Sequence, residues 1–260
     1  MIREIPKHKV DRLKEKSNKY CLCIPVINEG EKIQKQIKSI FDLNLTKVVD
    51  VIICDGGSTD GSLEIDFLKS NDITCLLTKT DVGKLSAQLR MGYSFALDEG
   101  YDGIITVDGN GKDNMSAING FVQALNDGYD MIQGSRFVDG GKAINTPMSR
   151  HLALKLIHAP LISMSSGFRY TDTTNGYRGY SRKMLLDPKI NIFRNIFDTY
   201  ELLAYLSIRS VKLGYKVIEI PVERAYPKNE KIPTKISPLK GNWNVFKILI
   251  KASLNKYDPE

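Results

Sequence analysis

Residues 20–54, YCLCIPVINEGEKIQKQIKSIFDLNLTKVVDVIIC, contain the pattern that decides the fold. The apolar run Tyr20–Val26 predicts a strand, and apolar side chains at helical spacing follow it over residues 31–41. A continuous apolar run at 48–54 then predicts a strand that is buried on both faces. A strand, a helix and a second strand in this order are typical of a right-handed crossover between parallel strands.

The same alternation continues to residue 134. Further strands are expected at 73–78, 103–107 and 131–133, and further helices at 60–69, 84–98 and 114–126. After a loop-like stretch at 137–150, we expect a helix, a strand at 176–181, a helix at 200–213, a strand at 216–222, an irregular stretch at 224–241 and a last helix at 243–254. The fold class is therefore α/β, with a mainly parallel sheet flanked by helices.

Composition limits the class of protein. The chain has 260 residues, of which 42% are hydrophobic and 26% charged, which suits one large α/β domain and excludes a disordered chain. No apolar run reaches the ~18–20 residues that a membrane-spanning helix needs. The N-terminus MIREIPKHKV has no apolar signal segment, so we expect a cytoplasmic protein. The cysteines lie in apolar runs outside any CxxC pair, and we expect buried, reduced thiols rather than a zinc site.

The net charge of +7 comes from the two ends of the chain. Residues 1–20 carry +4 and residues 224–260 carry +5, whereas the stretch between them carries −2. Basic ends can serve an anionic lipid, a phosphate-bearing substrate or solubility alone. Nucleic acid is a poor candidate, because the basic ends lack the interleaved aromatic side chains of a stacking platform.

Polar or glycine-rich segments follow each of the first five predicted strands. The carboxyl ends of parallel strands meet at one edge of a sheet, where ligands bind. The segments are 25–29 (PVINE), 55–61 (DGGSTDG), 81–84 (DVGK), 108–113 (DGNGKD) and 134–136 (GSR).

Two of these segments carry candidate ligands. Asp108 and Asn110 can each offer an oxygen to Mg²⁺ or Mn²⁺, whose other positions go to water and a diphosphate. The alternative is a plain turn with an Asx hydrogen bond. Asp55 can accept hydrogen bonds from a base or ribose, or Ser58 and Thr59 can cap the next helix. The stretch is not the GxGxxG fingerprint, so hydride transfer is disfavoured.

Taken in order, PVINE, ICDGGSTDGS, VDGNGKD, QGSR and DTTNGYR (172–178) resemble the motifs of family 2 glycosyltransferases with the GT-A fold. Among these, the chain is most similar to the dolichyl- or polyprenyl-phosphate sugar synthases. The resemblance implies an inverting, metal-assisted enzyme that moves a sugar from a nucleotide-sugar donor to an acceptor. We therefore divide the chain into a basic N-terminal extension (1–19), a glycosyltransferase domain (20–236) and a C-terminal amphipathic helix and tail (237–260).

The resemblance implies a role for each matching residue. Asp108 and Asn110 would hold Mg²⁺ or Mn²⁺, and Asp108 would be catalytic together with Asp172 and Arg136. Arg136 and Arg150 match two arginines that hold the acceptor phosphate, which guanidinium groups bind bidentately. A solvated surface arginine is the alternative for Arg150. The nucleotide would bind to Pro25, Asn28, Glu29, Asp55, Lys84, Asp108 and Gly109.

The chain departs from the family's pattern at four positions. Asn110 stands where the family usually has Asp, and Lys112 occupies a further ligand position. Gly56 replaces the second Asp of the family's DDGS stretch, and Leu85 replaces a glycine. The loss of negative charge should weaken the metal site, and Lys112 would supply a fixed counter-charge.

The resemblance implies a polyprenyl or dolichyl phosphate at a membrane surface as the preferred acceptor. The oxygen of such a phosphate is already anionic near neutral pH and needs no strong base. A hydroxyl of a polysaccharide precursor would need a carboxylate base, for which Asp172 is the candidate. A nucleotidyltransferase and an inactive nucleotide-binding protein are further alternatives.

The last predicted helix bears on the acceptor. It can lie on an anionic membrane surface as a peripheral contact, or pack on its own domain or a second subunit. One polar, basic stripe is formed by Lys240, Asn244, Lys247, Lys251 and Asn255.

Overall fold

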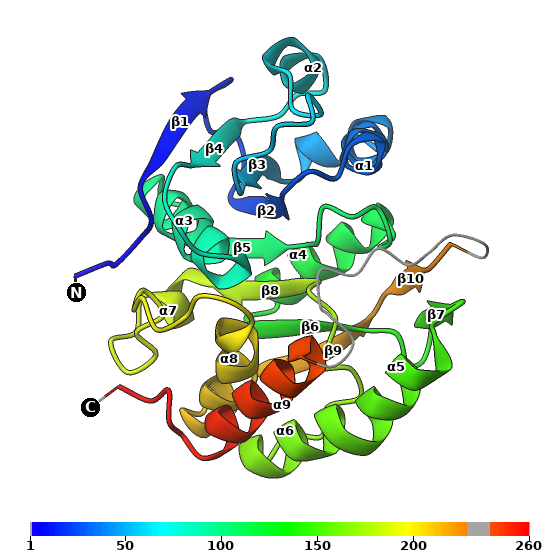
Figure 1. Ribbon diagram of the computed structural model, residues 1–260. Helices are drawn as coiled ribbons and strands as arrows, with labels where there is room; N and C mark the ends of the chain where they lie inside the picture. Colours follow the sequence, from blue (N-terminus) through cyan, green and yellow to red (C-terminus); the bar gives the residue numbers. More distant parts are fainter. Residues whose placement is uncertain (1, 228–239, 260) are drawn as a thin grey trace.

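One mixed sheet forms the centre of the molecule. In the computed structural model, which describes residues 2–227 and 240–259, eight strands run in the order β1-β4-β3-β2-β5-β8-β6-β9 (Figure 1). Neighbours are parallel except at β1 and β8, which lie antiparallel to the strands beside them. The strands are β1 (His8–Arg12), β2 (Tyr20–Val26), β3 (Asp50–Asp55), β4 (Cys75–Lys79), β5 (Gly103–Thr106), β6 (Met131–Ser135), β8 (Arg178–Ser181) and β9 (Val217–Pro221).

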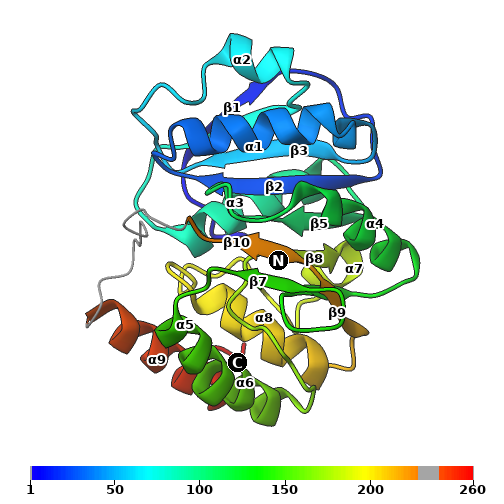
Figure 2. The ribbon, with the colours of Figure 1, turned by 90° about the vertical axis from the view of Figure 1, so that its right-hand side faces the viewer.

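Helices cover both faces of this sheet (Figure 2). One face is covered by α1 (Glu31–Asp42), α2 (Ile65–Ser70) and α4 (Ile118–Asn126), with 3₁₀ turns at Leu45–Lys47 and Met115–Ala117. The other is covered by α3 (Leu85–Asp98), α6 (Ala159–Ser166), α7 (Arg182–Leu185), α8 (Glu201–Lys212) and α9 (Lys240–Ser253). Helix α5 (Met148–Ala153) continues into α6 through a π-helical turn, Leu154–His158.

The alternation of side chains along β2 explains the two cores. Cys21 and Cys23 point into the cluster with α3 and α8, whereas Leu22 and Ile24 point into the cluster with α1 and α4. All four side chains are fully buried. The chain's cysteines are all free and buried, which confirms the expectation of reduced core thiols.

Most of the predicted strands are confirmed to within two residues, because each is an apolar run that the sheet buries. The strand β8 is also where the sequence placed it. The helix expected at 60–69 begins only at Ile65. The Asp60 carboxylate accepts hydrogen bonds from the backbone and hydroxyl of Ser62 (3.1 and 2.7 Å), which stabilise a turn before the helix.

Three short strands were not predicted. The strand β1 lies in the segment expected to be a basic extension and forms an edge of the sheet beside β4. The strand β7 (Lys142–Ile144) lies within the stretch expected to be loop-like, and it pairs in parallel with β10 (Glu223–Ala225). This two-stranded ribbon lies over the carboxyl edge of the main sheet (Figure 2).

The last helix packs on its own domain. Ile248, Leu249 and Ala252 are buried, and α9 contacts α6 and α8, while Trp243 stays 57% exposed. The exposed face of α9 includes Asn244, Lys247 and Lys251 of the predicted stripe, and Asn255 is exposed just beyond the helix. Most of the irregular stretch (228–239), the boundary predicted at 236/237 and the side chain of Lys240 lie outside the described residues.

Within residues 2–227 and 240–259, no helix combines the length and the apolar character needed to cross a bilayer.

Candidate active site

The loops after β2 and β3 are joined by hydrogen bonds. The Asn28 side chain accepts one from the backbone of Thr59 (2.8 Å), and the Asn28 backbone donates one to the Ser58 hydroxyl (3.0 Å). Ser58 in turn donates from its backbone and hydroxyl to Asp55 (2.9 and 2.6 Å). Ser58 therefore orients Asp55 rather than capping α2, and the two loops form one surface.

A glutamine beneath this surface ties the two strand ends together. The Gln88 amide on α3 donates to the carbonyls of Val26 (2.8 Å) and Cys54 (3.0 Å). A Cβ atom on Gly56 would lie 2.9 Å from the Gln88 side-chain nitrogen. The glycine that replaces an aspartate of the family pattern thus leaves room for Gln88.

The loop that begins at Asp108 is held from α1 and β2. The Gln36 side chain donates to the Asp108 carbonyl (3.1 Å) and accepts from the Gly111 backbone (2.9 Å). The backbone of Gly109 donates to the Pro25 carbonyl (3.3 Å). A Cβ atom on Gly109 would lie 2.8 Å from Val26, so only glycine allows this close approach.

The Asp108 carboxylate lies between two distant segments. A Cβ atom on Gly176 would lie 2.4 Å from Asp108 Oδ1, so the loop before β8 packs directly against the carboxylate. On its other side, Arg224 Nη2 forms an ion pair with Asp108 Oδ2 at 3.1 Å. The Asn110 amide lies 3.4 Å from the same oxygen, and its own buried Oδ1 has no hydrogen-bond partner among the described residues.

Arg224 joins two carboxylates. Its second nitrogen pairs with Asp113, whose side chain is fully buried. Burial raises the pKa of Asp113 to about 6; the charge of Arg224 opposes this rise and that of Asp108 adds to it. Arg224 itself is only 7% exposed, so it is a fixed part of the site rather than a surface arginine.

Three cations surround the ring of Tyr226. The charged groups of Lys112, Arg150 and Arg224 lie 5.1, 5.7 and 5.9 Å from the ring centroid. Arg150 also lies 3.4 Å from the Tyr226 hydroxyl. Burial alone would raise the pKa of Tyr226, but the charge of Arg224 and the Arg150 contact lower it below its usual range. Burial and the nearby arginines likewise lower the pKa of Lys112.

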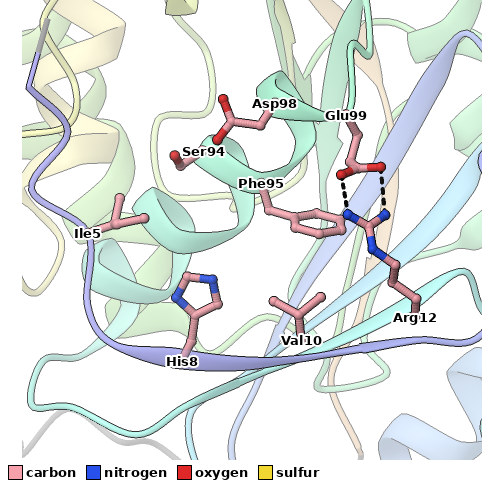
Figure 3. A pocket seen from close by; sticks show the side chains of 8 residues that line it. All are labelled: Ile5, His8, Val10, Arg12, Ser94, Phe95, Asp98 and Glu99. Carbon is pink, nitrogen blue, oxygen red and sulfur yellow. Dashed lines mark hydrogen bonds and ion pairs between the residues drawn. The ribbon is translucent and has the colours of Figure 1, made fainter.

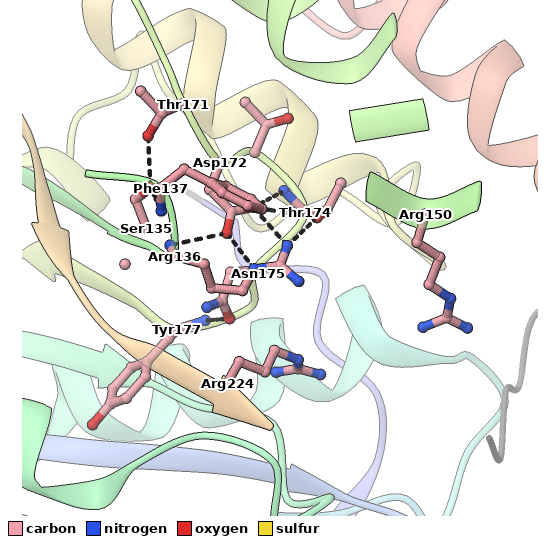
Figure 4. Close-up of polar contacts among 12 residues, drawn as sticks. Ser135, Arg136, Phe137, Arg150, Thr171, Asp172, Thr174, Asn175, Tyr177 and Arg224 are labelled. Carbon is pink, nitrogen blue, oxygen red and sulfur yellow. Dashed lines mark hydrogen bonds and ion pairs between the residues drawn. The ribbon is translucent and has the colours of Figure 1, made fainter. Parts of the chain in front are cut away.

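A buried ion pair lies beside this cluster (Figure 4). Arg136 donates from Nε and Nη2 to the two oxygens of Asp172 (2.6 and 3.0 Å), and also to the Thr174 hydroxyl (2.9 Å). Asp172 is fully buried, and its backbone donates to the Glu219 carboxylate (3.0 Å). The Asp172 carboxylate therefore orients Arg136 and has no exposed surface.

A model of the family described as Glycosyl transferase family 2 matches residues 21–187, more than half of the chain. The chain belongs to glycosyl transferase family 2.

Curated relatives and solved structures agree with this family. The chain is 27% identical over 202 residues to the polyprenol monophosphomannose synthase of Mycolicibacterium smegmatis, covering 76% of this chain and 74% of the relative. It is 27% identical over 204 residues to the dolichyl-phosphate hexose transferase of Haloferax volcanii, covering 76% and 84%. This family 2 chain is a glycosyltransferase.

The fold is that of GT-A enzymes. The glucosyl-3-phosphoglycerate synthase of Mycobacterium tuberculosis, solved with Mn²⁺, UDP and phosphoglyceric acid, superposes with a TM-score of 0.64 at 16% identity. The match covers 91% of this chain and 78% of that one. Another structure of that synthase holds Mg²⁺ and UDP, with the same TM-score of 0.64.

The structure of this family 2 chain brings most of the predicted site residues to one edge of the sheet. The Asp108 loop touches Pro25, and the Asn28 loop touches the Asp55 turn. Arg150 reaches the same cluster from α5 and remains exposed. Lys84 is exposed at the N-terminus of α3, where its backbone donates to the Asp198 carbonyl (3.3 Å). Glu29 is half-buried in the loop after β2.

The sequence did not predict three residues that shape the site. Gln36 belongs to a helix and is the buried polar member of an otherwise apolar face, which was the one available signal. Arg224 and Tyr226 follow β9 in the stretch expected to be irregular, and no local pattern distinguishes them from surface residues.

The metal-binding capacity of the site is limited. Among the described residues, no group of three His, Cys, Asp or Glu side chains is placed to hold a metal ion. Asp108 and Asn110 together offer a carboxylate, 28% exposed, and an amide oxygen without a partner. Both are oxygen ligands of the kind that Mg²⁺ and Mn²⁺ bind, so the residues fit an ion that a diphosphate helps to coordinate.

A cavity of about 480 Å³ lies elsewhere, between β1 and the C-terminal end of α3 (Figure 3). Arg12 and Glu99 close one side of it with a bidentate ion pair (2.6 and 2.7 Å). It lies along the edge strand β1, and none of the residues that line it belongs to the candidate active site.

Proposed function

We propose that this glycosyltransferase moves a hexose from a nucleotide-sugar to a polyprenyl or dolichyl phosphate, with inversion at the anomeric carbon. The observation that supports this most is the group of Lys112, Arg150 and Arg224 around Tyr226, directly beside Asp108. An anionic donor and an anionic acceptor both need cations where they meet. The names of the two curated relatives also support a lipid-phosphate acceptor.

The nucleoside of the donor would lie over the turn after β3. Asp55 would accept a hydrogen bond from the base or ribose, because Ser58 already orients its carboxylate. Asn28 and Glu29 would border the base, and Lys84 would approach the phosphates from the exposed end of α3. Pro25, Asp108 and Gly109 would form the floor beneath the ribose and diphosphate.

Asp108 and Asn110 would hold Mg²⁺ or Mn²⁺ at the diphosphate. When bound, the ion would offset the negative charge of the departing nucleoside diphosphate. The unpartnered buried oxygen of Asn110 supports this assignment, because a buried polar atom without a partner is costly.

The acceptor phosphate would be held by Arg150 and Arg136. A phosphate monoester is largely dianionic at neutral pH, so its oxygen attacks without losing a proton to the enzyme. The bond from this oxygen to the anomeric carbon forms as the bond to the diphosphate oxygen breaks, and the nucleoside diphosphate leaves. We assign Asp172 to the positioning of Arg136, in place of the base role that a hydroxyl acceptor would require.

An exposed apolar stripe near Arg150 supports contact with a membrane. Met148, Leu152 and Leu156 follow one another at four-residue spacing on α5 and the π-helical turn, and they are 71%, 48% and 71% exposed. Met164 on α6 is 85% exposed. Side chains of this kind would enter the lipid interface and bring Arg150 to the level of the lipid headgroups.

Thermal unfolding with nucleoside diphosphates tests the donor site. We expect one of UDP, GDP, CDP and dTDP to raise the Tm by about 5 °C or more in the presence of Mn²⁺, when the nucleotide is at about a hundredfold excess over its own Kd. Asp108→Ala should abolish the part of this shift that Mn²⁺ adds over the same nucleotide in EDTA, whereas Asp42→Ala, which removes an exposed carboxylate at the end of α1, should preserve the whole shift. No shift with any of the four nucleotides would count against the proposal.

A further inference from the structure

Lys112 occupies a position where the family's pattern has a further metal ligand. The strand β10 holds its backbone in place. The Lys112 carbonyl accepts a hydrogen bond from the Ala225 backbone (2.8 Å). The neighbouring Asn114 exchanges two hydrogen bonds with Glu223, one from its own backbone (3.0 Å) and one to its side-chain oxygen (2.8 Å). The loop of Lys112 and the segment around β10 are therefore joined along their length.

The ammonium group of Lys112 is held inside the site. It lies 5.1 Å from the centroid of the Tyr226 ring, and the residue is half-buried. The same ring contacts Arg224, which is fixed between Asp108 and Asp113. Two cations from opposite segments thus contact one ring, next to the partly exposed carboxylate of Asp108.

The charges of this cluster favour an anion over a lone cation. The charged groups around Tyr226 and Asp108 are Asp108, Asp113, Lys112, Arg150 and Arg224, and the ion pair of Arg136 with Asp172 beside them adds no net charge. Together these groups leave one net positive charge when all are ionised. A divalent ion arriving alone would be repelled by three cations and would compete with Arg224 for Asp108. A diphosphate, with several negative charges, would be attracted by the same groups.

We propose that Lys112 and Arg224 form a built-in counter-charge for the diphosphate. The chain then binds a nucleoside diphosphate without a divalent ion, and it gains a divalent-ion site only once the diphosphate is bound. This inference rests on the proposed function, because it assumes that the phosphates of the donor lie beside Asp108.

Binding of inorganic pyrophosphate, UDP and GDP to the full chain tests it by calorimetry, in EDTA and again in Mn²⁺. Pyrophosphate makes the result independent of the base. For the wild-type chain we expect the Kd in EDTA to exceed the Kd in Mn²⁺ by less than tenfold. In Lys112→Gln the Kd in EDTA should rise about tenfold, and in Lys112→Asp the ratio of the two values should exceed a hundredfold. Lys38→Gln, which removes an exposed charge on α1, should match the wild type.

Spin resonance of free Mn²⁺ provides a second readout that does not depend on activity. The wild-type chain should bind no Mn²⁺ at micromolar concentrations unless pyrophosphate is present, whereas Lys112→Asp should bind it alone. If Lys112→Asp fails to fold, as judged by its circular dichroism, Lys112→Gln carries the comparison.

Two results would overturn the inference. If the wild-type chain loses binding more than a hundredfold in EDTA and Lys112→Gln behaves identically, the built-in counter-charge is refuted while the donor site stands. If neither pyrophosphate nor any nucleotide binds under either condition, the inference and the proposed function both fail.

Discussion

At the end of β5, Gln36 holds the Asp108 loop at two points, through the Asp108 carbonyl and the Gly111 backbone. Its side chain is 4% exposed, so water cannot easily replace either contact. Both hydrogen bonds of the Gln36 side chain go to backbone groups of the loop, so its effect on the donor would pass through the position of the loop.

Gln36→Met removes both hydrogen bonds and keeps the apolar shape. We expect nucleoside diphosphate affinity to fall about tenfold, and the free energy of unfolding to fall by about 1–3 kcal/mol because two backbone groups lose their partner. Calorimetry and urea unfolding measure the two effects. Gln123→Met, which changes an exposed glutamine on α4, is the control and should leave affinity unchanged.

Asp172→Asn distinguishes a positioning role from a base. The substitution leaves the buried Arg136 charge without its carboxylate, so we expect a loss of about 3–5 kcal/mol in the free energy of unfolding. Glu223→Gln, which breaks the exposed pair with Lys142, should cost less than about 1 kcal/mol. Full stability of Asp172→Asn together with lost transfer would instead indicate a base.

Local sequence explains why some site residues could be predicted and others could not. Apolar runs end directly before Asp55 and Asp108, and Asn110 lies two residues beyond Asp108. The position of all three at the carboxyl edge of the sheet could therefore be predicted. Arg224 lies 116 residues from Asp108, and only the path of the chain after β9 brings the two together. The ion pair between Arg136 and Asp172 could not be predicted either, because each residue on its own was interpreted as a group that contacts the substrate.

Among the elements, β3 depends on a carboxylate at its first residue. Asp50 is fully buried and accepts hydrogen bonds from the backbone and side chain of Ser17 and Asn18 and from the Tyr101 hydroxyl (2.8–3.1 Å). All of these donors are uncharged. Burial alone would raise the pKa of Asp50, but the hydrogen bonds from Asn18 and Ser17 lower it below its usual range.

Asp50→Asn should therefore destabilise the fold in a pH-dependent way. A lowered pKa in the folded state stabilises the protein fully above the unfolded pKa, about 3.9, and the contribution disappears as the pH falls through the folded value. We expect Asp50→Asn to cost about 1–3 kcal/mol at pH 7 and the difference from wild type to narrow below about pH 4. Urea unfolding at both values measures it, with exposed Asp102→Asn as control. A difference that persists unchanged at low pH would contradict this account.

Element by element, burial decides what the sequence could predict. The central strands β2, β3 and β5 are fully buried, and their continuous apolar sequences already indicate this burial. The edge strand β1 is largely exposed, with the sequence HKVDR, and the ribbon strands β7 and β10 have three residues each. Such strands form because a neighbouring strand offers hydrogen bonds, which a single segment does not reveal.

In the whole molecule, the groups proposed for the donor's nucleoside and those proposed for the acceptor phosphate come from different halves of the chain. The strands β2, β3 and β5 carry the loops proposed for the donor, whereas Arg136 follows β6 and Arg150 belongs to α5 (Figure 1). The exposed apolar stripe also belongs to the second half of the chain. It begins on α5, the helix that carries Arg150, and α5 continues into α6.

Leu152→Gln combined with Leu156→Gln should weaken binding to vesicles that contain anionic lipid. Two exposed leucines would lose their apolar contact, and we expect the partition coefficient to fall at least tenfold while the Tm stays within a few degrees. Sedimentation with the vesicles measures it. Leu43→Gln, a half-exposed leucine after α1, is the control, and equal loss in both variants would exclude the stripe as the lipid-binding surface.

Transfer of labelled hexose from a panel of nucleotide-sugars to polyprenyl phosphate tests the central claim most directly. The account predicts that one donor labels the lipid, that Asp108→Ala abolishes the transfer, and that Arg150→Gln raises the KM for the lipid at least tenfold while exposed Arg169→Gln does not. A chain that binds a nucleoside diphosphate but labels no polyprenyl phosphate from any donor would contradict it.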